Sequence, residues 1–134
     1  YRKKISGPLL DRIDIHITVP HIPYEKLEQP AGESSIDIRA RVVAAREIQR
    51  RRYQNESFSL NAEASSHHIG RFVPLNPQTS LLLKTAHHRH HLSLRAHYRI
   101  LKLARTIADL SGLPNLNDTH ILEALRYRLP DYVT

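Results

Sequence analysis

The chain has 134 residues, which is enough for one domain with a buried core. Its 20 lysine and arginine residues outnumber 13 aspartate and glutamate residues, and the formal net charge of +7 indicates either a polyanionic partner or a solvated basic surface. The absence of cysteine excludes disulfides, thiol catalysis and cysteine-ligated metals, and fits a reducing, cytoplasmic location. No stretch approaches 18 apolar residues, so no membrane partner is expected.

Two further absences bear on the organisation of the chain. The four glycines are widely separated and no Gly-Lys-Ser/Thr occurs, so the chain carries no P-loop for a triphosphate. It also contains no methionine and starts at Tyr1, from which we expect a segment of a longer protein.

The first element in chain order is a short β-strand. Apolar β-branched residues alternate with polar ones, and this period of two predicts a half-buried strand over residues 13–19. The apolar face consists of Ile13, Ile15, Ile17 and Val19. No second strand is indicated, so its sheet partners are expected before Tyr1. A connector marked by Pro20, Pro23, Pro30 and Gly32 follows.

Two helices with a loop between them come next. Ser34 or Ser35 can cap a helix that reaches about Tyr53. Its apolar face is expected to hold Ile38, Val42, Ala45, Gln49 and Tyr53. Residues 55–75 indicate a loop with a short helix near Asn61, and the cap Asn76 with Pro77 predicts a second helix to about His90.

The last two helices complete the fold class. Ser93 can cap a third helix that ends at Gly112, and Asn117 a fourth that Pro130 stops. We therefore expect a mainly α protein, a small helical bundle preceded by an arm with one short β-strand.

The third helix has two distinct faces. Its apolar residues fill about half of a helical wheel, while Arg95, Arg99 and Lys102 form a narrow stripe opposite them. Arg105 and Asp109 can pair beside this stripe at i, i+4. The stripe is either a solvated polar face or a row of cations for phosphates.

A second candidate residue, Arg12, ends the stretch Leu9-Leu10-Asp11-Arg12 just before the predicted strand. Its guanidinium group can reach across a surface to a phosphate, or it can pair with Asp11 or Asp14 or face solvent.

Five residues near the end of the second helix form a histidine cluster, His87-His88-Arg89-His90-His91. Histidines at i, i+3 and i, i+4 could chelate Zn²⁺ or Ni²⁺. No carboxylate or thiol ligand is adjacent, and Arg89 would repel a cation. A solvated helix end is therefore favoured, and no metal ligand is assigned.

Four stretches together resemble one protein family. They are SGPLLDRIDIHITVP (6–20), ESSIDIRARVVAAREIQ (33–49), Leu60-Asn61-Ala62 and LSLRAHYRILKLARTIADLSG (92–112). They look like the C-terminal part of the magnesium-chelatase-like AAA+ ATPases, with the bacterial competence-associated branch as the best match.

The resemblance implies roles for three residues. The family's arginine finger corresponds to Arg12 and its sensor-2 arginine to Arg95, while Arg99 is a weaker candidate for nucleotide binding. ATP and Mg²⁺ would bind the full-length protein, which would be a homo-hexamer. This segment alone would bind no cofactor and would be inactive. Such a role is physically sensible because phosphoryl transfer needs positive charge near the γ-phosphate.

The resemblance also implies a domain organisation and a substrate. Residues 1–22 would end the AAA+ core, 23–32 would be a linker, and 33–134 would form the helical lid. The upstream core would be a partner of this segment. The expected activity is DNA unwinding or branch migration, and the basic run Arg50-Arg51-Arg52 also favours DNA as the partner. The alternatives are a motor subunit of a metal chelatase and a stand-alone basic helical module that binds DNA.

Overall fold

The computed structural model describes residues 12–21, 23–24 and 32–128. Within these residues five α-helices and one 3-10 helix follow one another. They are α2 (Ser35–Arg52), η3 (Asn61–Glu63), α3 (Ser66–Phe72), α4 (Pro77–His90), α5 (Leu94–Leu110) and α6 (Asp118–Arg128). The mainly α fold class is confirmed. Predictions on Leu9–Asp11, Pro30 and Pro130 fall outside the described residues.

Hydrogen-bonding caps fix where the helices begin. The side chains of Ser34, Asn76, Ser93 and Asn117 accept backbone N–H bonds from Asp37, Thr79, Ala96 and His120. These are the caps that the sequence predicts, because Ser and Asn oxygens satisfy N–H groups left open in the first turn. The prediction of a short helix near Asn61 is confirmed by η3. The prediction of a loop after it is wrong in part, because α3 begins at a further cap, Ser65.

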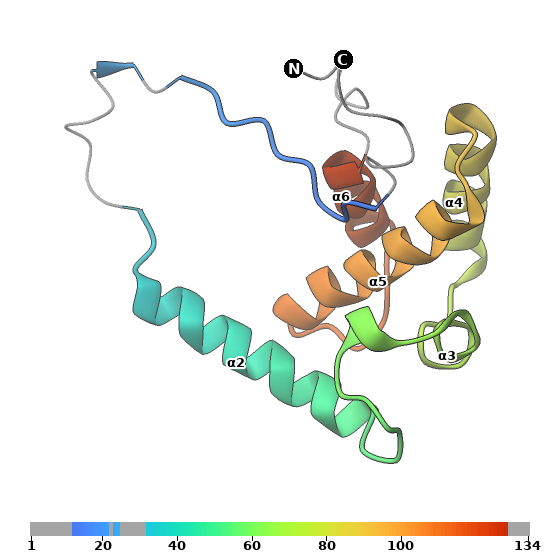
Figure 1. Cartoon of the computed structure of the whole chain (residues 1–134), viewed down its shortest axis with the longest axis horizontal. Helices are drawn as coiled ribbons and strands as arrows, with labels where there is room; N and C mark the ends of the chain where they lie inside the picture. Colours follow the sequence, from blue (N-terminus) through green and yellow to red (C-terminus); the bar gives the residue numbers. More distant parts are fainter. Residues whose placement is uncertain (1–11, 22, 25–31, 129–134) are drawn as a thin grey trace.

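The centre of the bundle is α5, which packs against α2, η3, α3 and α6 (Figure 1). Its buried residues are Ala96, Ile100, Leu101, Ala104, Arg105, Ile107, Ala108 and Asp109. The predicted apolar face is thus confirmed, except that Leu103 is half-buried and Leu110 is exposed. The helix ends before Gly112, whose φ of +68° suits a residue without a Cβ atom.

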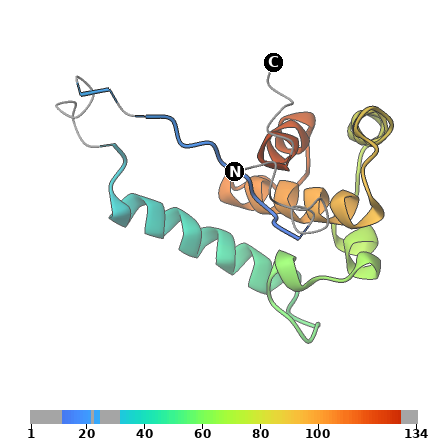
Figure 2. The same ribbon diagram turned by 45° about the horizontal axis from the view of Figure 1, so that its top comes forward.

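Only the C-terminal half of α2 joins this core. Ala45, Gln49 and Tyr53 are buried, whereas Ile38 and Val42 are exposed, although one apolar face was expected to include all five. Figures 1 and 2 show why, since the first turns of α2 extend away from the other helices. None of the described helices is long and apolar enough to cross a bilayer.

The arm differs from its prediction. Residues 12–21 form no β-strand, and the exposed fractions of Ile13 and Val19 are 41% and 82%. A strand needs a neighbouring strand to complete its ladder, and no described residue supplies one. The arm is instead attached to α6, where the His16 N–H donates to the Tyr127 carbonyl over 2.7 Å.

Candidate functional site

The predicted cationic stripe lies along one side of α5. Arg95 is the second residue of the helix, and its side chain is exposed. No residue that the structure describes forms an ion pair with it. Arg99 and Lys102 follow one and two turns later and are half-buried. The helix presents Arg95 to solvent because its opposite face is committed to the core.

Arg99 connects this stripe to the arm. Its Nη1 atom donates to the Arg12 carbonyl oxygen over 2.6 Å and also to the Asp14 carboxylate. The Arg128 guanidinium donates to the Ile13 carbonyl nearby. The structure therefore brings the backbone of Arg12 to the same helix as Arg95 and Arg99, while the Arg12 side chain is exposed.

A small pocket of about 200 Å³ lies where the arm meets α5. Asp14, Arg99, Lys102 and Thr106 contribute its polar lining. The Lys102 ammonium group donates to the Ala62 carbonyl over 2.9 Å. Burial and then repulsion from Arg99 lower the pKa of Lys102, which Asp14 partly offsets. Arg99 and Lys102 are thus close enough for the charge of one to act on the other.

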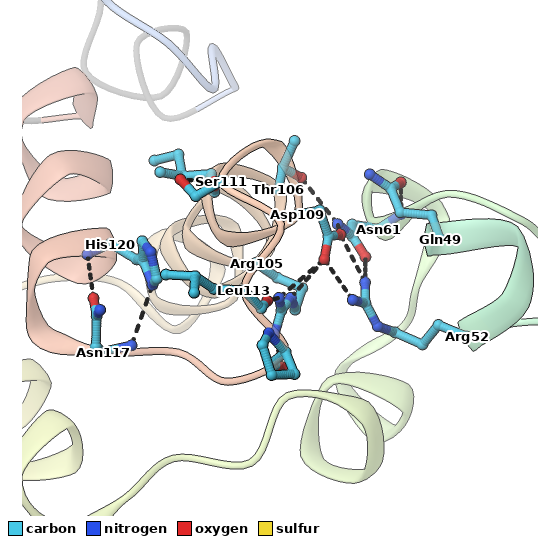
Figure 3. Close-up of polar contacts among 12 residues, drawn as sticks. Gln49, Arg52, Asn61, Arg105, Thr106, Asp109, Ser111, Leu113, Asn117 and His120 are labelled. Atoms are coloured by element: carbon cyan, nitrogen blue, oxygen red, sulfur yellow. Dashed lines mark hydrogen bonds and ion pairs between the residues drawn. The ribbon is translucent and has the colours of Figure 1, made fainter. Parts of the chain in front are cut away.

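Beneath the stripe lies a buried polar cluster centred on Asp109 (Figure 3). Its side chain is fully buried and accepts hydrogen bonds from Arg52 of α2, Asn61 of η3 and Arg105 of its own helix. The distances from Asp109 oxygens to Arg52 Nη1, Asn61 Nδ2 and Arg105 Nε are 2.7, 2.9 and 3.0 Å. One carboxylate therefore ties together three segments that are far apart in sequence.

The remaining polar atoms of the cluster are also bonded. Arg105 donates to the carbonyl oxygens of Leu113 and Pro114, which fixes the α5–α6 loop. The Asn61 Oδ1 atom accepts a hydrogen bond from the Tyr53 hydroxyl group, and its Nδ2 atom donates one to the Thr106 hydroxyl oxygen. Buried charges are tolerated when they are paired and hydrogen-bonded in this way.

Electrostatics within the cluster follow from burial and pairing. Burial alone would lower the pKa of Arg52, but the hydrogen bond and charge of Asp109 outweigh it and the pKa is raised. For Arg105 burial prevails and its pKa is lowered despite the same partner. Both guanidinium groups remain protonated at neutral pH, because arginine side chains do not lose their proton in proteins.

Comparison with known proteins shows to which family the chain belongs. A family profile described as "Magnesium chelatase, subunit ChlI C-terminal" matches residues 32–128, and "Magnesium chelatase, subunit ChlI" matches residues 1–27. The chain belongs to the magnesium chelatase ChlI family. The first profile covers α2 to α6, and thus the whole bundle that carries the stripe and the buried cluster.

Individual relatives show which branch of the ChlI family the chain resembles. The chain is 41% identical over 130 residues to "Competence protein ComM" of Haemophilus influenzae, which covers 96% of this chain and 25% of that protein. It is 38% identical over 133 residues to "Uncharacterized protein YifB" of Salmonella typhimurium (98% and 26%). It is 34% identical over 128 residues to "Uncharacterized protein Mb2921c" of Mycobacterium bovis (96% and 25%). The chain thus spans about a quarter of the length of these relatives and is ComM/YifB-like.

For this member of the ChlI family, sequence reasoning missed most of the buried cluster. The expected Arg105–Asp109 pair exists, but it lies in the core and not beside a solvated stripe. Arg52 was grouped with Arg50 and Arg51 as a basic run, yet it pairs with Asp109 and only its two neighbours are exposed. A usable signal was the buried-face position of Gln49, whose Oε1 atom accepts the Asn61 N–H over 3.0 Å.

The histidine cluster at the end of α4 shows no metal site. Among residues 12–21, 23–24 and 32–128, no group of three or more metal-ligating side chains comes together. His91 adopts a left-handed conformation with φ of 47° and ends the helix as its cap.

Stability of this bundle is expected to fall as the pH drops below neutral. The buried His120 accepts the Asn117 N–H on its Nδ1 atom, so its neutral form is the bonded one. Burial and then the charge of Arg105 lower the pKa of His120 below the ordinary value of 6.5. The unfolded chain then binds the proton more tightly, and stability is lost as the pH falls through about 6.5. Urea unfolding at pH 7.5 and 5.5 measures the loss.

The matched variant is His120→Asn, which retains an acceptor near the Nδ1 position but does not titrate. Its stability should depend less on pH than that of the wild type. An equal pH dependence in both proteins would remove His120 from this account.

Proposed function

We propose that this chain is the C-terminal part of an ATP-driven AAA+ motor of the competence-associated branch, acting on DNA. In this proposal residues 1–22 end the ATPase core, 23–32 form a linker and 33–134 form the lid. The motor is a cytoplasmic homo-hexamer with nucleotide held between subunits. The name of the Haemophilus relative, a competence protein, supports the choice of DNA.

The observation that carries the ATPase assignment is the position of Arg95. Its guanidinium group is exposed at the start of α5, has no acidic partner among the described residues, and stands on a helix whose other face is packed in the core. An exposed arginine on a rigid helix fits a phosphate, because guanidinium donors match phosphate oxygens. Arg95 would bind the γ-phosphate as sensor 2.

Arg12 would act as the arginine finger. Its carbonyl oxygen is held by Arg99 and its side chain is exposed, so the backbone is anchored while the guanidinium group can approach a neighbouring subunit. In the full-length protein, bound ATP would supply the phosphoryl group that is transferred, and Mg²⁺ would neutralise charge on its phosphates. Arg99 contacts Asp14 here, so its predicted binding to a nucleotide requires Asp14 to give way.

Replacement of Arg12 by alanine tests the finger assignment in the full-length protein. Loss of a finger costs about 10³–10⁵ in turnover in GTPases, and a large fall in ATP hydrolysis with retained ATP binding is expected. Steady-state hydrolysis and binding of a fluorescent ATP analogue measure the two quantities. Arg46→Ala is the matched control, since Arg46 is an exposed arginine on α2. Equal turnover of Arg12→Ala and the wild type would refute the assignment.

A second candidate function has one observation in its favour. The matching family profile is described by the magnesium chelatase subunit ChlI, a name that supports a motor for metal insertion. The two functions differ in their response to DNA, because a DNA motor should hydrolyse ATP faster when DNA is bound.

A further inference from the structure

One continuous stretch of the chain accounts for its excess of positive over negative charge. Residues 64–108 contain no aspartate or glutamate, but hold seven lysine and arginine residues and seven of the ten histidines. The remaining 13 lysine and arginine residues equal the 13 acidic residues in number. The whole net charge of +7 therefore comes from α3, α4 and most of α5.

Most cations of this stretch are bonded within the fold. Arg71 pairs with Glu56, Arg99 with Asp14, Arg105 with Asp109, and Lys102 donates to the Ala62 carbonyl. Three exposed cations make no ion pair with any residue that the structure describes: Lys84, Arg89 and Arg95. Lys84 and Arg89 lie on α4, and Arg95 lies on the first turn of α5.

A pocket of about 330 Å³ lies between α4 and α5, and Lys84 is the one of these three cations that lines it. Its apolar lining comes from Leu75, Leu83 and Leu94, and its polar lining includes Lys84, His87, His88 and His97. The rings of His87 and His97 are 6.2 Å apart across the two helices. Figures 1 and 2 both place α4 at the edge of the bundle remote from α2, and the residues that line the pocket belong to α4, α5 and, with Leu75, the segment before α4.

The pocket is short of negative charge. Burial and then the charge of His87 lower the pKa of His97, and the groups around it are Lys84, His87 and His88 of α4 and the Tyr98 ring of α5. None of these supplies a carboxylate. A bound anion would offset the repulsion and favour the protonated imidazoles.

We propose that the α4–α5 pocket binds a single strand of nucleic acid, with a phosphate at Lys84 and a base against the leucines and imidazole rings. Apolar and ring surfaces accept any base, and unpaired cations bind the backbone. A pocket of this size admits one unpaired base, which favours a single strand over a duplex. The choice of ligand rests on the proposed action on DNA, and it adds where this chain contacts the strand.

Fluorescence anisotropy with a labelled oligo-dT 20-mer tests the surface without ATP, on the 134-residue chain. Lys84→Gln should weaken binding about threefold and lower the log–log salt slope by about 0.7, the contribution of one phosphate contact to a single strand. The matched control Arg50→Gln removes one charge from α2, where Arg50 lies near Glu47, and should retain most of the affinity. Circular dichroism checks that both variants fold.

A histidine variant separates the pocket from general charge. Binding should tighten several-fold from pH 8 to pH 6, because a bound phosphate favours the protonated form of His97, and His97→Gln should remove most of that gain. Equal weakening by Lys84→Gln and Arg50→Gln, displacement by polyglutamate as readily as by oligo-dT, or no binding by the wild type would overturn the proposal. Because the assay contains no ATP, these outcomes are independent of whether Arg95 and Arg12 serve ATP hydrolysis.

Discussion

Replacing Asp109 by asparagine is expected to lower the free energy of unfolding by about 3–5 kcal/mol, the usual cost of removing one partner of a buried ion pair. The carboxylate is fully buried and faces two guanidinium groups, Arg52 and Arg105. Without it, two positive charges would remain in the core with no compensating negative charge. Urea unfolding of the 134-residue chain measures the difference.

Glu33→Gln is the control for this prediction. It breaks another arginine–carboxylate pair, with Arg41 at 2.6 Å, but both side chains are exposed. Exposed pairs contribute about 0–1 kcal/mol, so the control should be close to the wild type. If Asp109→Asn were as mild as Glu33→Gln, the cluster would not stabilise the fold.

The second large effect is expected from Arg95→Ala in the full-length protein. Removing one preorganised donor to a developing charge costs about 10²–10³ in turnover, and we expect a fall of this size in ATP hydrolysis. The fold should survive, because the side chain is exposed and its helix is held by residues on the opposite face.

Two controls accompany the Arg95 variant. Arg46→Ala removes an exposed arginine from α2 and should leave turnover unchanged. Arg95→Lys retains the charge but not the two-pronged geometry, and should recover only part of the activity. If Arg95→Ala hydrolysed ATP as fast as the wild type, the sensor-2 assignment would be wrong and the stripe would be a solvated helix face.

Local signals explain how much of the fold was predictable. Caps such as Ser93 and Asn117 act within one turn, and the apolar period of α5 reflects burial of a single helix face. Both depend on neighbours in sequence, so the helix starts and most of the core face of α5 follow from the sequence. The same reasoning places Arg95 on the face opposite the core.

The parts that could not be predicted depend on distant partners. Arg52 meets Asp109 across 57 positions, and nothing near either residue indicates this pair. The alternating pattern of residues 13–19 indicates a strand correctly only if another strand is available. The prediction that the first turns of α2 would be buried is wrong for the same reason. An apolar face shows that a helix can be buried but not which segment it packs against.

The most direct test of the central claim is ATP hydrolysis by the full-length protein, with and without single-stranded DNA, for the wild type and Arg95→Ala. The proposal predicts turnover that DNA stimulates and that collapses in the variant. Turnover that depends on Arg95 but ignores DNA would favour the chelatase-type motor. Turnover that is unaffected by Arg95→Ala would contradict the account.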